Sequence, residues 1–416
     1  MSTRTNERTA EAGRRGSDVR SDCWVKITLA DSGGIDLALT SKVESMYGDS
    51  IRKLVPDVVG SLAIKDARLE IEDAGALPFV IAARIEAAVA RLWHRRSACG
   101  LTGETPVPPT GGQYLPEFAP HAQYGTQRDR FRRSRLYLPG NEPKFMLSAG
   151  LHGPDGVILD LEDSVAPSVK DEARVLVRNA LRTIDFKGAE RMVRINQGDR
   201  GIRDLDFIVP HNVHIVLIPK VESPEQVTRV DEHVKAILKN NGIDRPVFLM
   251  PIVESALGAI MAYEIATASP NVCALTIGLE DYTADIGTQR TNEGRESFWA
   301  RSQVVNAARA AGVQPIDTVF SDVSDMDALR ESVLEAKSLG FDGKGCIHPR
   351  QIAVIHEAFA PSDEELEKAK KIVAAFEEAE AKGLGAVSLG NKMIDPPVVK
   401  RALRVVELAD AMGVAG

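Results

Sequence analysis

The chain is predicted to be an α/β protein whose main part is a (β/α)8 barrel, preceded by a small α+β domain and followed by a C-terminal helical extension. Eight short apolar runs alternate with helical stretches over roughly 220 residues, which is the element count of such a barrel. A segment rich in Pro, Gly and Thr precedes this pattern, as is typical of a linker. The first run ends in Pro139-Gly140-Asn141, which is no Gly-rich dinucleotide fingerprint, so a doubly wound open sheet is only the runner-up.

Five segments follow from the composition along the chain. Residues 1–20 are rich in Arg, Ser, Thr and Glu without apolar periodicity, so they are expected to be disordered. The small domain is assigned to residues 21–93 and the linker to residues 94–130. The barrel is expected to occupy residues 131–360, and the helical extension residues 361–416.

The small domain is expected from two alternating runs and one amphipathic helix. Residues 25–29 and 35–39 alternate apolar with other side chains around a Gly-containing turn, which predicts a β-hairpin. A helix is expected over residues 42–54 and a third strand around residues 69–71. Residues 77–92 place apolar side chains on one face at helical spacing, which predicts a second helix.

The barrel elements are expected where apolar runs and helical spacing alternate. Strands are predicted at residues 136–138, 157–159, 192–195, 215–218, 247–252, 273–277, 316–319 and 345–347. Helices are predicted at residues 169–181, 224–239, 258–268, 295–311 and 326–339, and in the extension at residues 363–383 and 397–412.

The totals exclude several classes of protein. The net charge of −8 and the pI near 5.6 argue against a nucleic-acid binder. The four cysteines are scattered, without the spacing of a zinc site or a disulfide framework. The N-terminus has no apolar core of a secretion signal, and no apolar run reaches membrane-spanning length. A cytoplasmic protein without a membrane or nucleic-acid partner is therefore expected.

Two carboxylates at neighbouring strand ends are the first candidates for chemistry. Glu254 follows the fifth predicted strand, and Asp281 follows the sixth. The carboxyl ends of barrel strands carry the active site, and two hard oxygen ligands beside open positions suit Mg²⁺. A single acid here would more often cap the following helix, but the pair in this order favours a metal site.

Polar residues also follow the other predicted strands. They are Asp160, Glu162 and Asp163 after the second, Arg194 and Asn196 after the third, Lys220 and Glu222 after the fourth, Ser321 and Asp322 after the seventh, and His348 after the eighth. Helix capping can explain a polar residue after a single strand, but it does not easily explain polar residues after nearly every strand. The pattern favours an anionic substrate held by Mg²⁺ and Arg, with a carboxylate free for proton transfer.

From residue 133 to about residue 412, the chain resembles the citrate lyase β subunit and its relatives in the HpcH/HpaI aldolase superfamily, the malyl-CoA and citramalyl-CoA lyases. The motifs that carry the resemblance are Arg133-Ser134-x-Leu136-x-x-Pro139-Gly140-Asn141, Leu161-Glu162-Asp163-Ser164-Val165, Lys170-Asp171-x-Ala173-Arg174, Val193-Arg194-Ile195-Asn196, Pro219-Lys220, Ile252-x-Glu254-Ser255-Ala256-Leu257-Gly258, Asp281-Tyr282-x-x-Asp285-Ile286-Gly287, Gly343-Lys344, Pro349-x-Gln351, Gly383-Leu384-Gly385 and Lys392-Met393-Ile394-Asp395. Their order over some 280 residues makes the resemblance specific.

The resemblance implies roles for individual residues. Glu254 and Asp281 are expected to hold Mg²⁺, and Arg194 to stabilise negative charge on the substrate or enolate. Glu162 and Asp163 are expected to orient Arg194 and a metal-bound water, and one of them to act as the base. The expected roles of the remaining residues are substrate binding by Arg133 and Lys170, together with Arg194 and Glu254, and protonation of the enolate in a neighbouring subunit by Asp395.

The first domain resembles the acyl carrier protein, or γ subunit, of the same enzyme system. The resemblance is carried by Ile35-Asp36-Leu37, Val43-Glu44-x-x-Tyr47-Gly48-Asp49 and Ala83-Arg84-Ile85-Glu86-Ala87. It implies a phosphoribosyl-dephospho-CoA arm on a serine just before the first strand. Arg20 occupies the usual serine position, so Ser21 is the expected attachment site, with Ser17 second.

The resemblance implies a Mg²⁺-dependent carbon–carbon lyase that cleaves a citryl thioester to oxaloacetate and an acetyl thioester. A malyl-CoA or citramalyl-CoA lyase, or a thioesterase acting on free CoA thioesters, is the enzymatic alternative. A non-catalytic carrier and scaffold subunit is the second class. An α-type acyl transferase subunit is an expected partner, and the chain is expected to form a homotrimer or hexamer.

Overall fold

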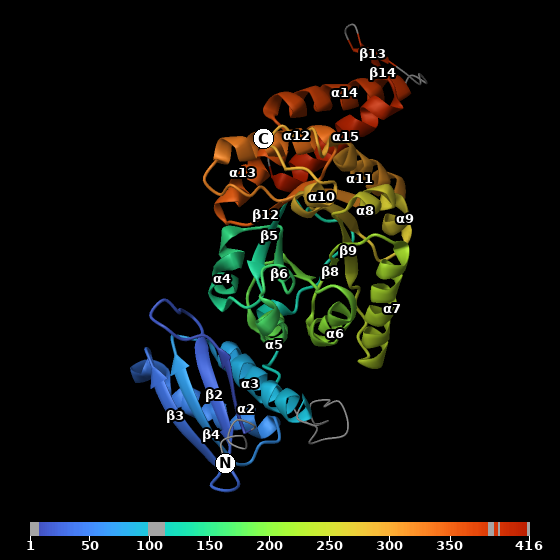
Figure 1. Cartoon of the computed structure of the whole chain (residues 1–416). Helices are drawn as coiled ribbons and strands as arrows, with labels where there is room; N and C mark the ends of the chain where they lie inside the picture. The colour runs from blue at the N-terminus through green and yellow to red at the C-terminus, as the bar shows by residue number, and fades with distance from the viewer. Residues whose placement is uncertain (1–7, 99–112, 382–386, 390–391, 414–416) are drawn as a thin grey trace.

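The computed structural model describes residues 8–98, 113–381, 387–389 and 392–413. They form a small N-terminal domain, an eight-stranded barrel and a C-terminal pair of helices, and the two smaller parts lie on opposite sides of the barrel (Figure 1). No helix in these ranges is long and apolar enough to cross a bilayer.

The N-terminal domain is a four-stranded sheet covered by two helices. Its strands are β1 (Thr9–Gly13), β2 (Cys23–Leu29), β3 (Ile35–Ser41) and β4 (Ala67–Asp73), in the order β1-β2-β4-β3. The helices are α2 (Glu44–Ser61) and α3 (Pro78–Ala98). Inward side chains such as Ile27, Leu69 and Ile85 are buried together, since alternate residues of each strand face the helices.

Two predictions for this domain are wrong. Residues 9–13 lie in the segment expected to be disordered, yet they form β1, which pairs antiparallel with β2 through its small buried residues Ala10 and Ala12. The predicted hairpin does not form either, because β4 lies between β2 and β3 and pairs with both of them. Residues 1–7 of the predicted disordered segment lie outside the described residues.

The barrel prediction is confirmed. Eight parallel strands close in the order β10-β11-β12-β5-β6-β7-β8-β9. The strands are β5 (Ser134–Pro139), β6 (Gly156–Asp160), β7 (Glu190–Arg194), β8 (Ile215–Ile218), β9 (Phe248–Val253), β10 (Ala274–Ile277), β11 (Gln314–Asp317) and β12 (Gly343–Cys346). The helices around them are α4 (Pro143–Ser148), α5 (Lys170–Thr183), α6 (Gly198–Ile208), α7 (Pro224–Asn240), α8 (Ala256–Ile260), α9 (Ala262–Thr267), α10 (Leu279–Asp285), α11 (Phe298–Ala311), α12 (Met326–Leu339) and α13 (Arg350–Phe359).

The predicted linker is only partly a linker. The helix α3 continues to Ala98, and residues 99–112 lie outside the described residues. Beyond them, the chain packs against the amino-terminal end of the barrel: the Tyr124 hydroxyl donates to the Ala189 carbonyl at 2.6 Å, and Arg191 donates to the Tyr124 carbonyl at 2.8 Å. This segment therefore closes the end of the barrel opposite the strand carboxyl ends.

Two buried sets of ion pairs join the N-terminal domain to the barrel, where α3 packs against α5 (Figure 1). Arg84 on α3 forms a two-point ion pair with Asp22, at 2.9 and 2.8 Å, and lies 3.3 Å from Glu172 on α5. Arg178 on α5 reaches back to α3 and binds both oxygens of Glu86, at 2.8 and 2.7 Å. The N-terminal domain is thus held against α5 of the barrel by buried ion pairs in which each arginine has a carboxylate partner.

The extension consists of α14 (Asp363–Ala381), the short strands β13 (Val387–Leu389) and β14 (Lys392–Ile394), and α15 (Pro396–Met412). The helices α14 and α15 pack on each other, and an ion pair from Arg404 to Asp342 ties α15 to the loop before β12. The predicted helices of the extension are present at nearly the predicted positions.

Candidate active site

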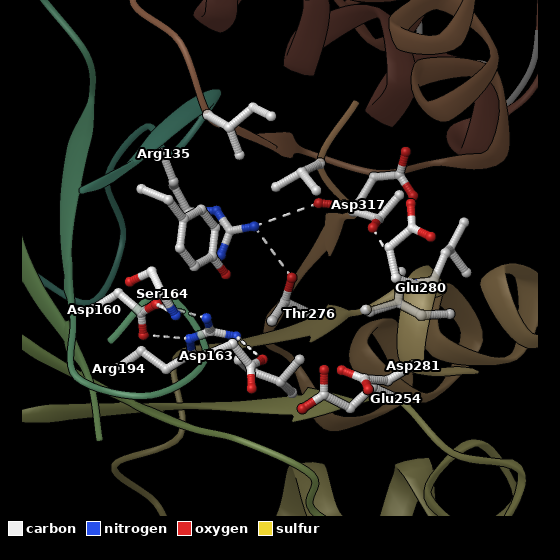
Figure 2. A pocket seen from close by; sticks show the side chains of 18 of the residues that line it. Arg135, Asp160, Asp163, Ser164, Arg194, Glu254, Thr276, Glu280, Asp281 and Asp317 are labelled. Atoms are coloured by element: carbon white, nitrogen blue, oxygen red, sulfur yellow. Dashed lines mark hydrogen bonds and ion pairs between the residues drawn. The ribbon is translucent and has the colours of Figure 1, made fainter. Parts of the chain in front are cut away.

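A cavity of about 450 Å³ opens at the carboxyl end of the barrel strands. Its charged lining residues come from six of the eight strands or the loops after them: Arg135, Asp160, Asp163, Arg194, Glu254, Glu280, Asp281 and Asp317 (Figure 2). Most of these groups lie at or just beyond the last residues of their strands, whereas Arg135 lies within β5.

Glu254 and Asp281 enter this cavity from β9 and from the first turn of α10, as the sequence predicts (Figure 2). Lys220 holds both: its backbone N–H donates to Glu254 Oε1 at 2.7 Å, and its ammonium donates to Asp281 Oδ1 at 3.0 Å. Burial raises the pKa of Glu254 to about 8, and the charge of Asp281 adds to the effect, although the Lys220 N–H opposes it.

These two carboxylates fit a magnesium ion. The described chain holds no group of three or more His, Cys, Asp or Glu arranged for a metal, so a fully protein-made cage is absent there. Mg²⁺ does not need one, because it is commonly bound by one or two carboxylates and completes its shell with water and substrate oxygens. The nearby Gly278 leaves space for the Glu254 carboxylate, since a Cβ at residue 278 would lie only 2.6 Å from Glu254 Oε2.

Arg194 lies at the end of β7 and is fixed by Asp160 at the end of β6. Its Nε and Nη2 donate to the two Asp160 oxygens, each at 2.7 Å, which is the planar fork that Arg and carboxylate favour. Burial disfavours the charged guanidinium, but the hydrogen bonds and charge of Asp160 outweigh it, so the pKa of Arg194 is raised. The sequence interpretation assigned this orienting role to Glu162 and Asp163, whereas Asp160 makes the stronger contact.

Glu162 and Asp163 both lie beside Arg194, with one oxygen of each 3.2 Å from its Nη1. They differ in access to the cavity: Asp163 lines it, whereas Glu162 is buried and accepts from Gln197 at 2.7 Å. Burial, reinforced by a hydrogen bond with Asp163, raises the pKa of Glu162 to about 7. Asp163 is therefore placed to meet a ligand directly, and Glu162 to act behind Arg194.

The two remaining barrel residues expected to bind substrate do not line the cavity. The Lys170 ammonium donates to the carbonyls of Leu161 and Glu162, at 2.9 and 2.6 Å, and so holds the loop after β6. Arg133 precedes β5 at the opposite end of the barrel, where its Nε and Nη2 bind Asp155 at 2.8 Å each. The expectation of substrate contact by Arg133 is wrong, because a barrel strand separates it from the catalytic end.

Sequence reasoning missed Arg135, Tyr137, Thr276 and Asp317, which also line the cavity. A signal existed for the first two: side chains alternate along a strand, so residues 135 and 137 share one face of β5. The sequence of β5 alone does not tell which of its faces points into the barrel. Its apolar residues Leu136 and Leu138 face the surrounding helices, so the polar residues face inward.

The two candidates outside the barrel lie in different places. Asp395 is the N-cap of α15, where its carboxylate accepts from the Val398 N–H at 3.2 Å, and it does not line the cavity of its own chain. Ser21 is half-buried with a positive φ of 56°, and its N–H donates to the Ala74 carbonyl. Ser17 is exposed on the loop between β1 and β2.

The fold and this site are those of a barrel enzyme that breaks a carbon–carbon bond, and comparison with known proteins agrees. Residues 133–349 match the family described as HpcH/HpaI aldolase/citrate lyase, and residues 7–92 match the family described as malonate decarboxylase delta subunit. The chain therefore belongs to the HpcH/HpaI aldolase/citrate lyase family, as a carbon–carbon lyase with a carrier-like N-terminal domain.

Three relatives illustrate the similarity. The citrate lyase subunit beta of Leuconostoc mesenteroides subsp. cremoris is 39% identical over 288 residues, covering 68% of this chain and 95% of the relative. The mitochondrial citramalyl-CoA lyase of Mus musculus is 35% identical over 296 residues, covering 68% and 87%. The structure of CitE from Mycobacterium tuberculosis in complex with magnesium, acetoacetate and coenzyme A is 31% identical with a TM-score of 0.58, covering 68% of this chain and 100% of that one.

Proposed function

We propose that this chain is a Mg²⁺-dependent lyase that cleaves a citryl thioester to oxaloacetate and an acetyl thioester. The observation that carries the proposal is the meeting of Glu254, Asp281 and Arg194 around one cavity at the strand carboxyl ends. The similarity to citrate lyase β subunits supports this choice of substrate.

Glu254 and Asp281 would hold the ion, which supplies a Lewis acid for the hydroxyl and carboxylate oxygens of the substrate. Arg194, held in a fixed orientation by Asp160, stabilises the negative charge that develops on substrate oxygens. Asp163 lines the cavity and takes the proton from the hydroxyl on C3. The C2–C3 bond then breaks, its electron pair forms the enolate of the acetyl thioester, and protonation at C2 completes the products.

The proton for C2 comes, in this proposal, from Asp395 of a neighbouring subunit in a homotrimer or hexamer. Its support is the position of Asp395 at the start of α15, which lies in an extension beyond the barrel (Figure 1). Mixing an Asp395→Asn chain with an Arg194→Ala chain tests it: hybrid oligomers should regain activity that neither variant has alone. If mixing restores nothing under conditions of subunit exchange, Asp395 does not act between subunits.

The carrier-like domain is proposed to bear a phosphoribosyl-dephospho-CoA arm on the loop between β1 and β2. Of the two serines, exposed Ser17 is favoured over Ser21, which is half-buried beside the buried Asp22. The loop that carries Ser17 also lines a cavity of about 330 Å³, together with Glu142 and Lys144. These two residues follow β5, at the carboxyl end of the barrel strands. An arm attached there would start on the same side of the barrel as the active site, and tethering would raise the local substrate concentration.

Intact-mass measurement of the protein from its native host, followed by peptide mapping, tests the arm. An adduct on Ser17 or Ser21 establishes a tethered substrate and favours an α-type acyl transferase as partner. An unmodified chain from a host that holds the attachment enzyme removes this part of the proposal.

A lyase acting on free malyl-CoA or citramalyl-CoA, or a thioesterase for such compounds, is the second candidate. The arginine at the usual serine position, Arg20, and the similarity to citramalyl-CoA lyases favour it. Incubation of the purified chain with each CoA thioester and Mg²⁺ separates the candidates, because lyases release a keto acid and thioesterases release only free CoA and the intact acid. A purely structural role in a cytoplasmic complex predicts neither product.

A further inference from the structure

Arg135 is a buried cation that has no carboxylate partner among the described residues. Its side chain rises from β5 inside the barrel, and the residue is 1% exposed. Nη1 donates to the sulfur of Met250 at 3.0 Å, and Nη2 donates to Thr276 Oγ1 at 3.1 Å and, more weakly, to the Asp317 carbonyl at 3.4 Å. Nε has no partner, and no described carboxylate lies within ion-pair distance.

The other fully buried arginines in the described chain are better satisfied. Arg84, Arg132 and Arg178 each bind a buried carboxylate. Arg191 has no carboxylate, but it donates to three backbone carbonyls at the closed end of the barrel. Arg135 has instead a weak sulfur acceptor, one hydroxyl and one distant carbonyl. A buried charge with so few acceptors is costly unless a ligand supplies the missing ones.

The nearest carboxylate does not neutralise Arg135. Asp317 contributes only its carbonyl, because its side chain is engaged by Lys344 at 2.7 Å and by Arg301 at 3.2 Å. Figure 2 shows the Arg135 guanidinium directed toward Thr276 and Asp317, apart from the Arg194–Asp160 pair. Arg135 and Thr276 both line the cavity, so an anion entering it meets an uncompensated positive charge.

The position of Arg135 indicates which part of the substrate it meets. It is the second residue of β5, whereas Glu254 and Asp281 follow the last residues of their strands, so Arg135 lies deeper in the barrel. A thioester attached to a long arm must enter the cavity from the carboxyl end of the strands. The part of the acyl chain that is farthest from the sulfur therefore lies deepest in the barrel. Carbon 3 of both acyl chains carries a hydroxyl and a carboxylate; its remaining substituent is a carboxymethyl group in a citryl chain and a methyl group in a citramalyl chain.

We propose that Arg135, assisted by Thr276, binds a second carboxylate of the acyl chain and makes the enzyme prefer thioesters whose cleavage releases a dicarboxylic 2-keto acid. The proposal rests on the lyase function proposed above. Arg194, already paired with Asp160, stabilises the carboxylate and the enolate at the reacting carbons. Arg135 determines specificity for the part of the acyl chain that lies deepest in the barrel.

The kinetic test compares two thioesters that differ only in this carboxylate. Wild-type enzyme should prefer citryl-CoA to citramalyl-CoA, and Arg135→Met should lower kcat/KM for citryl-CoA by about 50-fold, mainly through KM, while changing citramalyl-CoA by less than about threefold. Thr276→Val, which removes one hydroxyl, should lower the preference by about fivefold. An equal loss on both thioesters in folded variants would overturn the proposal.

A binding measurement decides the same question without turnover. With Mg²⁺ present, oxaloacetate should raise the Tm of the wild type more than pyruvate does, and Arg135→Met should abolish the difference while Arg135→Lys keeps part of it. Arg133→Met is the matched control, since this arginine directly precedes β5, binds Asp155 outside the cavity and should leave the difference intact. If wild type cleaves neither thioester, the lyase function fails. In that case, equal Tm shifts by the two keto acids in the wild type would also refute the role of Arg135.

Discussion

The interface between the domains and the mouth of the barrel use the same charged residue types in opposite ways. At the interface, Arg84 and Arg178 are buried against Asp22, Glu172 and Glu86, and each cation has a carboxylate. In the cavity, Glu254 and Asp281 share only Lys220, and Arg135 has no carboxylate within the described chain. The charges that join the two domains are paired with one another, whereas Glu254 and Arg135 in the cavity have no oppositely charged side-chain partner in the described chain and are left for a metal ion and an anionic substrate.

The largest expected effect is loss of cleavage when a cavity charge is removed. Asp281→Asn and Arg194→Ala should each lower kcat/KM for the preferred thioester by roughly 1,000-fold, since each removes charge stabilisation needed mainly in the transition state. Keto-acid release measures the loss, and circular dichroism checks the fold. Near-normal rates in both variants would mean that the cavity is not the active site.

Breaking an interface pair should affect stability instead. Arg178→Met leaves Glu86 buried without its partner and should lower the free energy of unfolding by about 3–5 kcal/mol, as measured in urea. The Arg178→Met, Glu86→Leu double variant is the control, and it should recover most of the loss because no unpaired charge remains. A single variant as stable as the wild type would show that this pair is not buried in solution.

A smaller effect is expected from the pH dependence of Glu162. Its folded-state pKa, about 7, lies above the ordinary value of 4.5, so the folded chain binds a proton that the unfolded chain releases between these pH values. Glu162 therefore reduces stability as pH rises through this window. Glu162→Gln should match the wild type near pH 4.5 and exceed it at pH 8 by on the order of 2 kcal/mol in chelated buffer. Identical pH slopes would contradict the raised pKa.

The smallest effect is expected at Arg133. Arg133→Ala removes the ion pair with Asp155 at the closed end of the barrel, and it should change kcat and KM by less than about threefold. Steady-state kinetics with the preferred thioester checks this. A large rise in KM would restore the substrate-binding role that its position argues against.

The barrel and its main acids were predictable because their signals are local. Each strand was recognisable as an apolar run. Glu254 directly follows one run and Asp281 lies shortly after the next, at the end where barrels carry their sites. What escaped prediction depends on distant partners. The strand β4 separates β2 from β3 although it follows both in the chain, and β1 is held mainly by its pairing with β2.

The same limit explains the two arginines at the start of β5, one just before the strand and one within it. Arg133 and Arg135 are two residues apart and look equivalent in the sequence, yet one lies at the closed end with Asp155 and the other faces the cavity. Likewise, nothing local distinguishes Asp160 from Glu162 and Asp163 as the main partner of Arg194; the parallel pairing of β6 with β7 decides it.

The central claim is that Glu254 and Asp281 are left for a metal ion that cleavage requires. The most direct test measures keto-acid release from citryl-CoA and citramalyl-CoA by the purified chain, first in EDTA and then after Mg²⁺ is restored. The account predicts no release in EDTA, recovery with Mg²⁺ in the wild type and no recovery in Asp281→Asn. Release at the same rate in EDTA would contradict it, because Glu254 and Asp281 would then have no metal to hold.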